Sequence, residues 1–360
     1  MVERVTMDRR HVVGAIAGLS TGASMIARSG PAPGSRIDVH MHYVPRFYRD
    51  ALIAAGQSRP DGIPALPEWS LEAALAAMDQ VGIAAALMSI SSPGVHLGDA
   101  AAARRLARRV NEEGARARAA YPARFGFFAS LPLPDIDAAL AETTHALDVL
   151  GAEGVVLLTN HRGLYPGAPA LDPLYAELNR RKAVVFLHPT SPACPCCNGP
   201  HATTPDASLP PPLLEFIFET TRAVIGLVLA GTLRRFPDIR IIVPHAGAAL
   251  PVVADRVAGL IPALKLAGAP DARQIFEQLR RFHYDLAGFP IPRLLSALQQ
   301  IADPDRLLYG SDWPYTPLPA VLRLAGQQAT TPLLTPELRD RMLYGNALRL
   351  FPRLAATSGG

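Results

Sequence analysis

Cysteine and charge are both scarce in this 360-residue chain. The three cysteines all fall between Cys194 and Cys197, so they are too few and too close together to staple a disulfide-built scaffold. Charged residues make up 18% of the chain and hydrophobic residues 49%, which excludes a disordered or coiled-coil protein. A chain of this length and composition buries a substantial core.

An excess of charge of one sign is also lacking. Thirty-five Lys and Arg residues face 31 Asp and Glu residues, a formal net charge of +4, so we expect no nucleic-acid partner. The longest uncharged stretch near the N-terminus, Val12 to Ala27, is too short to cross a bilayer, and we expect no membrane span.

The N-terminus resembles a twin-arginine export signal. Asp8-Arg9-Arg10 precedes the weakly apolar stretch, and Val12-Val13 stand where that motif often has Phe-Leu. A Pro-Gly cluster at 31–34 marks a boundary. We therefore predict a signal and linker over 1–34, a periplasmic protein and one barrel domain over 35–354; the alternative is a cytoplasmic protein with an N-terminal extension.

Short apolar runs alternate eight times with longer helical patterns. The predicted strands are Ile37–His42, Ala85–Ile90, Phe125–Leu131, Val155–Thr159, Val184–His188, Arg240–His245, Phe282–Leu286 and Leu307–Ser311. The predicted helices include Leu71–Gln80, Ala100–Ala120, Ile136–Leu150, Leu171–Arg181, Leu213–Phe236 and Pro290–Ile301. Eight strand-then-helix units predict a (β/α)8 TIM barrel, and an open doubly wound sheet is the alternative.

Polar residues recur where these strands end. His40 and His42 end the first strand, His188 the fifth and His245 the sixth, and Asp312 follows the eighth. The carboxyl ends of barrel strands converge on one rim, where active sites lie. Because side chains alternate along a strand, His40 and His42 point to the same side and can share one metal ion.

Four segments of the chain give it a family resemblance. The segments are Ile37-Asp38-Val39-His40-Met41-His42, Phe186-Leu187-His188-Pro189, Val243-Pro244-His245-Ala246-Gly247 and Tyr309-Gly310-Ser311-Asp312-Trp313-Pro314. On these segments, the chain resembles the metal-dependent amidohydrolase superfamily from residue 36 to about 352. The resemblance implies an amidohydrolase-like barrel with a metal-dependent active site.

Within the superfamily, the chain is most similar to the decarboxylase branch, and there to the 6-methylsalicylate type. This likeness is carried by Trp69, Met78-Asp79, Gly82-Ile83, Val155 to Asn160, Glu215-Phe216 and Thr220 to Ala223. Ala248 departs from the pattern because many relatives have glycine there, and we expect a small change of loop geometry.

Lysine is nearly absent, which bears on the number of metal ions. Two-metal members of the superfamily generally bridge their ions with a carboxylated lysine at the end of strand 4. This chain has two lysines, Lys182 and Lys265, and neither lies at the carboxyl end of strand 4. A single-metal site is therefore expected.

The resemblance implies roles for the rim residues. His40, His42, His188 and Asp312 would hold one divalent ion, Zn²⁺ or alternatively Mn²⁺. His245 would act as a general acid or base, and either His245 or Asp312 would protonate the ring carbon as carbon dioxide leaves. Asp285 is a candidate for orienting a ligand histidine, and His283 is expected to be structural.

Other residues are weaker candidates for substrate contact. Asn160 and His161 follow strand 4, Arg222 and Arg256 could bind an anion, and aromatic rings could wall the site. The candidates are Trp69, Asn160, His161, Arg222, Arg256 and Trp313, with Phe289 as a further apolar wall.

The activity that this reading favours is non-oxidative decarboxylation of a small aromatic or enol carboxylic acid. The alternative is a metal-dependent hydrolase of a lactone, amide or ester, because one metal and one histidine serve either reaction. We also expect a homo-oligomer, a dimer or a tetramer. The Cys194 to Cys197 loop is interpreted as a lid whose thiols take no part in catalysis.

Overall fold

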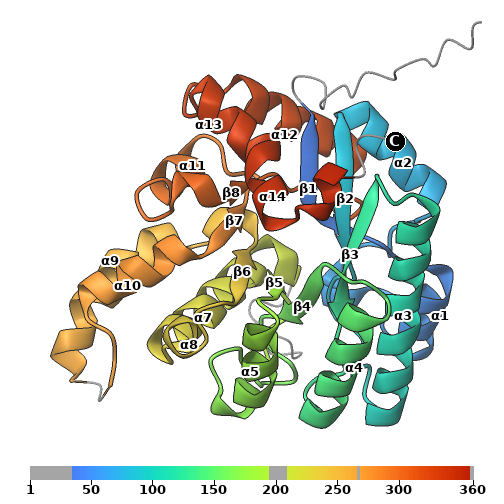
Figure 1. Cartoon of the computed structure of the whole chain (residues 1–360), viewed down its shortest axis with the longest axis horizontal. Coiled ribbons are helices and arrows are strands. Elements are labelled where there is room, and N and C mark those ends of the chain that lie inside the picture. Colours follow the sequence, from blue (N-terminus) through green and yellow to red (C-terminus); the bar gives the residue numbers. More distant parts are fainter. Residues whose placement is uncertain (1–34, 194–208, 266–267, 357–360) are drawn as a thin grey trace, which may run out of the picture.

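The computed structural model describes residues 35–193, 209–265 and 268–356, and these form a closed barrel of parallel strands wrapped by helices (Figure 1). Each strand pairs with the next one in sequence. Asp38 bridges Tyr309, and the Val39 N–H donates to the Tyr309 carbonyl at 3.0 Å, so the last strand returns to the first. The predicted (β/α)8 barrel is confirmed, and the open sheet is excluded.

The strands follow the predicted order closely. They are β1 (Arg36–His42), β2 (Ile83–Ser89), β3 (Phe125–Ser130), β4 (Gly154–Leu158), β5 (Val184–His188), β6 (Arg240–Val243), β7 (His283–Asp285) and β8 (Leu307–Leu308). The last three are shorter than predicted. After β6, Pro244 offers no N–H for a ladder, and His245 and Ala246 turn the chain with φ near 53°.

The helices cover the outside of the barrel (Figure 1). They are α1 (Arg46–Ala54), α2 (Leu71–Val81), α3 (Ala100–Ala120), α4 (Ile136–Asp148), α5 (Asp172–Arg180), α7 (Glu215–Leu229), α8 (Thr232–Arg235), α9 (Leu250–Leu264), α10 (Ala272–Arg281), α11 (Arg293–Leu298), α12 (Leu318–Thr330), α13 (Pro336–Asp340), α14 (Asn346–Leu350) and α15 (Arg353–Ala356). The prediction of one helix over Leu213–Phe236 was wrong, because Gly231 takes φ 64° and separates α7 from α8.

Several helices begin where the sequence supplies a side-chain cap. Ser70, Asp99 and Asp135 each accept a hydrogen bond from the N–H three residues on, which satisfies a donor that the first turn leaves free. Asp271 makes the reciprocal pair with Gln274 at the start of α10. These caps fix where each helix starts relative to the strand before it.

Large apolar side chains fill the barrel interior. Phe128 and Phe186 stack with ring centroids 5.4 Å apart, and Leu350, Phe351 and Leu354 from the C-terminal segment pack into the same cluster. A second layer of apolar residues joins the strands to the surrounding helices. The interior is therefore a packed core, and the polar residues that end the strands gather at the carboxyl-end rim.

Two predictions concern segments outside the described residues. The 1–34 segment and the Cys194 to Cys197 cluster both lie there, so the export signal and the lid remain predictions. Within the described part of the chain, none of the helices combines the length and the apolarity needed to cross a bilayer.

Candidate metal centre

Four residues far apart in the sequence meet at the rim. His40 and His42 end β1, His188 ends β5, and Asp312 lies in the turn after β8. One ligand atom from each lies within 4.8 Å of the others. The structure thus brings together all four side chains that the sequence singled out for one metal ion.

Each of the three histidines is held by its Nδ1 atom. The Nδ1–H of His40 donates to Asp285 Oδ2 at 3.0 Å, that of His42 to the Ser89 carbonyl at 3.1 Å, and that of His188 to the Pro189 carbonyl at 2.7 Å. A carbonyl can only accept, so in these contacts the Nδ1 of His42 and of His188 carries the proton; the Ser89 hydroxyl also lies 3.1 Å from His42 Nδ1. This leaves the Nε2 atoms as the ligand atoms of the cluster.

The donor set fits a divalent metal. The Nε2 atoms of His40 and His42 are buried, and both face Asp312 Oδ1, at 3.5 and 3.2 Å. With the protons on Nδ1, the Nε2 lone pairs and the carboxylate face one another, a buried arrangement that is costly unless a cation lies between them. Three imidazole nitrogens and one carboxylate form a set that Zn²⁺ and related ions accept.

Asp312 is fixed by its backbone and by a neighbour. It takes φ 59°, its N–H donates to the His40 carbonyl at 2.7 Å, and its Oδ2 accepts from the Thr316 hydroxyl at 3.0 Å. Its Oδ1 lies 3.2 Å from His42 Nε2 and 3.5 Å from His40 Nε2. The carboxylate therefore faces the same space as the imidazoles.

His245 stands at the edge of the cluster. Its Nε2 lies 3.8 Å from Asp312 Oδ2, its side chain is 16% exposed, and its N–H donates to Asp285 Oδ1 at 3.1 Å. Asp285 thus contacts both the ring of His40 and the backbone of His245, as its predicted orienting role requires. In the same turn Ala248 has φ 57°, a conformation that glycine adopts more readily than alanine.

The electrostatics of the cluster favour a bound cation. Burial opposes charge on His40, but the carboxylates of Asp285 and Asp312 outweigh it and raise the pKa of His40 to about 9. Burial lowers the pKa of His42 and of His188. Burial also opposes ionisation of Asp312, yet contacts with His245 and His42 hold its pKa well below the usual range. A metal ion would take the place of the proton on His40.

A cavity of about 670 Å³ opens beside the cluster, a size that suits a small organic molecule. His188, His245 and Asp312 line one side of it. Phe216 and Ile217 from α7 are among its apolar lining residues. The site can therefore bind a small molecule that has a polar end at the metal ligands and an apolar body.

None of the six weaker candidates lines this cavity. Trp69 packs near Tyr43 with ring centroids 6.2 Å apart, and Trp313 is buried, with its carbonyl accepting from the His42 N–H. Arg222 on α7 and Arg256 on α9 are exposed. Their contact with substrate stays a prediction.

Asn160 and His161 lie at the end of β4 and line a separate, smaller cavity. The Asn160 amide is already engaged, because it donates to Glu219 Oε2 at 3.0 Å and to the Ser191 carbonyl at 3.0 Å. These two residues therefore do not line the cavity beside the metal ligands, and their contact with substrate stays a prediction.

The structure adds cavity residues that the sequence did not single out. Tyr315 lines the cavity, its ring lies 5.3 Å from that of His42, and its hydroxyl makes no hydrogen bond within the described ranges. It follows Asp312 by three residues, which is a usable signal. Asp61 and Ser92 also line the cavity, but only the tertiary fold brings them to the rim.

Comparison with known proteins identifies the family of the chain. The amidohydrolase family matches residues 37–353. The chain is 37% identical to the decarboxylase yanB of Aspergillus niger over 88% of each chain. It is 38% identical to the 6-methylsalicylic acid decarboxylase acuB of Aspergillus aculeatus, over 89% of this chain and 96% of the relative. A crystal structure of an amidohydrolase II superposes with a TM-score of 0.81 at 39% identity, covering 88% of this chain and 99% of the other. With its barrel and its cluster of ligand atoms, the chain belongs to the amidohydrolase family.

Proposed function

We propose that this chain is a metal-dependent, non-oxidative decarboxylase of a small aromatic carboxylic acid. The observation that carries the proposal is the convergence of three imidazoles and one carboxylate beside a cavity with an apolar wall. Similarity to relatives named as decarboxylases over most of the chain supports decarboxylation over hydrolysis. The relative that acts on 6-methylsalicylic acid points to a hydroxybenzoate of that kind.

His40, His42, His188 and Asp312 would hold the ion. Three nitrogen ligands and one oxygen ligand suit Zn²⁺ best, with Mn²⁺ as the second choice. When bound, the ion would offset the negative charge of a substrate carboxylate and of an ortho oxygen and would orient both. The Nδ1 contacts of the three histidines keep their Nε2 atoms aimed at that ion.

His245 is the residue that we propose delivers the proton. Both oxygens of Asp312 are engaged, Oδ1 beside the ligand histidines and Oδ2 with Thr316, whereas the imidazole of His245 is not among the clustered ligand atoms and lines the cavity. The imidazolium would give its proton to the ring carbon. The bond from that carbon to the carboxyl group then breaks, its electron pair returns to the ring, and carbon dioxide leaves.

The cavity supports a compact, largely apolar substrate. Phe216 and Ile217 offer an apolar wall for the ring and a methyl group, while Asp61 and Ser92 offer polar atoms that could accept or donate to a ring hydroxyl. Replacing Phe216 by alanine would remove part of this wall and enlarge the cavity, and we expect weaker binding of a small acid.

The test is a metal-controlled assay of product formation. Purified protein, stripped with a chelator and reloaded with Zn²⁺ or Mn²⁺, is incubated with 6-methylsalicylate, and loss of the acid and gain of 3-methylphenol are followed by chromatography. We expect turnover that requires the metal. Metal-dependent cleavage of an aryl lactone, with no carbon dioxide from hydroxybenzoates, would instead establish the hydrolase alternative.

We further propose export to the periplasm through the 1–34 segment and assembly into a dimer or tetramer. The paired Arg9-Arg10 before an uncharged stretch supports export. Replacing both arginines by lysine keeps the charge and should leave the protein in the cytoplasmic fraction of an expressing bacterium. Light scattering of the purified protein tests the oligomer, and a mass near the monomer's would contradict it.

A further inference from the structure

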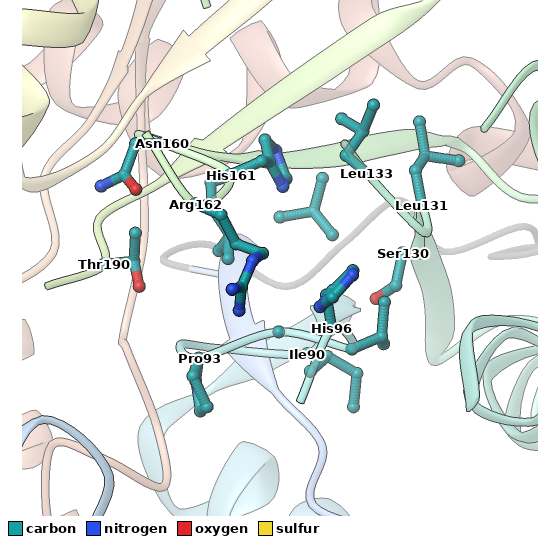
Figure 2. Close-up of a pocket in the computed structure, with 14 residues that line it drawn as sticks. Ile90, Pro93, His96, Ser130, Leu131, Leu133, Asn160, His161, Arg162 and Thr190 are labelled. Carbon is teal, nitrogen blue, oxygen red and sulfur yellow. The ribbon is translucent and has the colours of Figure 1, made fainter. Parts of the chain in front are cut away.

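A second cavity, of about 180 Å³, lies at the carboxyl ends of β2, β3 and β4 (Figure 2). It shares no lining residue with the cavity beside the metal ligands. Ser92 lines the metal side and Thr190 lines the second cavity, and their hydroxyl oxygens lie 2.7 Å apart. A single layer of side chains therefore separates the two spaces.

Two imidazoles and one guanidinium border the second cavity. Figure 2 shows His96, His161 and Arg162 around the same space. No aspartate or glutamate lines it, and Arg162 forms no ion pair with any other described residue. A cavity with a guanidinium and no carboxylate favours an anion.

The hydrogen bonds of His161 and His96 show which ring nitrogen of each can donate a proton to a ligand. His161 Nε2 accepts from the Leu158 N–H at 3.2 Å, so its proton is on Nδ1, and burial, with a smaller electrostatic contribution from neighbouring His96, lowers the pKa of His161 to about 3. His96 Nδ1 accepts from the Gly98 N–H at 3.3 Å, so its proton is on Nε2. Each ring therefore has one N–H that these bonds leave free to donate.

The Ser130 hydroxyl is an independent sign that a ligand belongs here. Ser130 is 4% exposed, lines the cavity, and its Oγ has no hydrogen-bond partner within the described ranges. Its backbone is fixed by Asn111, which accepts from the Ser130 N–H at 2.8 Å and donates to the Ser130 carbonyl at 3.0 Å. A buried hydroxyl without a partner is unfavourable, and an oxygen of a ligand would satisfy it.

The rest of the lining is apolar and sets the size of the ligand. Leu131, Leu133 and Leu158 surround the space together with Ile90 and Val156. A dry apolar cavity of about 150 Å³ is enough to hold benzene. The volume of about 180 Å³ therefore suits one aromatic ring that carries a small anionic group.

We propose that this cavity is a second binding site, independent of the metal, for a small aromatic monocarboxylate. The carboxylate lies against Arg162 and the free N–H groups of His96 and His161, and the ring lies among the leucines. If the proposed decarboxylation holds, this site binds the acid and releases the phenol, because the product has lost the anionic group that the site recognises.

The test locates a bromine atom. Crystals of the metal-loaded full chain are soaked with 4-bromobenzoate, and anomalous scattering shows where bromine lies; calorimetry with benzoate then counts the molecules bound per chain in solution. We expect bromine among Leu131, Leu133 and Leu158. Arg162→Gln should remove that peak and one equivalent of benzoate, while any peak at the metal centre stays.

Two further variants sharpen the result. His96→Asn keeps an acceptor for the Gly98 N–H and removes the free N–H, so it should weaken benzoate binding about tenfold, roughly the worth of one charge-assisted hydrogen bond. Arg105→Gln, at an exposed position of α3, is the control for losing one arginine.

Three outcomes would overturn the proposal. These are bromine only at the metal centre or nowhere, equal benzoate binding in Arg162→Gln and Arg105→Gln, and occupancy by bicarbonate with exclusion of benzoate. None of these measurements requires turnover, so failure of the decarboxylase assay would leave this result readable by itself.

Discussion

At the scale of single residues, the metal cluster depends on what holds the Nδ1 proton of each histidine. Two of the three partners are backbone carbonyls, and the third is the buried carboxylate of Asp285. Asp285 also accepts from the N–H groups of His245 and Ala287. One carboxylate therefore orients a ligand and positions the residue that we propose moves the proton.

Mutation of His245, the proposed proton donor, and of Asp312, the proposed metal ligand, should have different effects on metal content. His245→Asn is expected to abolish turnover while the metal stays bound, because the imidazole is not among the clustered ligand atoms. Asp312→Ala should cost both metal and turnover. Metal content by elemental analysis, together with product formation, checks this, and equal metal loss in the two variants would contradict the assigned roles.

Asp285→Asn removes the charge that faces His40 Nδ1 at 3.0 Å. We expect metal affinity to fall about 10- to 100-fold, the usual effect of losing such an outer partner. Competition with a chromogenic chelator measures it. Asp50→Asn on the exposed face of α1 is the matched control, and the same affinity in both variants would argue that Asp285 does not orient the ligand.

At the scale of elements, the barrel requires a close approach between β4 and β5. Gly154 pairs with Val184, and a Cβ at Gly154 would lie 2.2 Å from the Val184 carbonyl oxygen. The carbonyl oxygen belongs to the backbone of β5, so it cannot move aside as the end of a flexible side chain can. The contact between the two strands therefore requires glycine at position 154.

Gly154→Ala should destabilise the protein by about 3 kcal/mol or more, the upper end of what overpacking costs, because the strands must move apart. Gly226→Ala is the control, since an added Cβ there meets no atom within 4 Å. In the middle of α7 this substitution should instead raise the free energy of unfolding by about 0.5–1 kcal/mol, because alanine favours a helix more than glycine does. Urea unfolding measures both, and equal midpoints would show that β4 and β5 tolerate the side chain.

At the scale of the whole molecule, the two ends of the barrel have different tasks. The carboxyl-end rim holds the titratable cluster, while His283 begins β7 near the opposite end, beside Arg306 and Arg240. Burial, followed by these arginines, lowers the pKa of His283 to about 3. His283 is thus neutral in the folded protein, as its predicted structural role requires.

This burial predicts loss of stability in acid. Between the unfolded pKa near 6.5 and the folded pKa of about 3, the unfolded chain binds a proton at His283 that the folded chain does not. The free energy of unfolding therefore falls as the pH drops, by about 2 kcal/mol between pH 7 and pH 5 from this residue alone. His283→Gln should show a smaller fall in urea midpoint than wild type, and His145→Gln on α4 is the control for removing one imidazole.

The order and type of the elements, and the gathering of polar residues at one rim, follow from local features of the sequence. Apolar runs such as Val155 to Leu158 predict buried parallel strands, and capping residues such as Asp99 predict where helices start. His40, His42, His188, His245 and Asp312 could be placed together because every strand of such a barrel ends at the same rim, and the family resemblance implied which four of them would hold the ion.

Tertiary structure alone decided the rest. Asp61 and Tyr315 line one cavity, and Ser130, His96 and Arg162 line another, because strand ends and loops that are distant in the sequence meet at the rim. Gly231 separates α7 from α8, although the apolar periodicity of the sequence predicts one continuous helix there. Asp285 contacts His40, 245 positions away in the sequence. The physical reason is that periodicity and capping act over a few residues, whereas a cavity is made by side chains whose proximity depends on how the whole barrel closes.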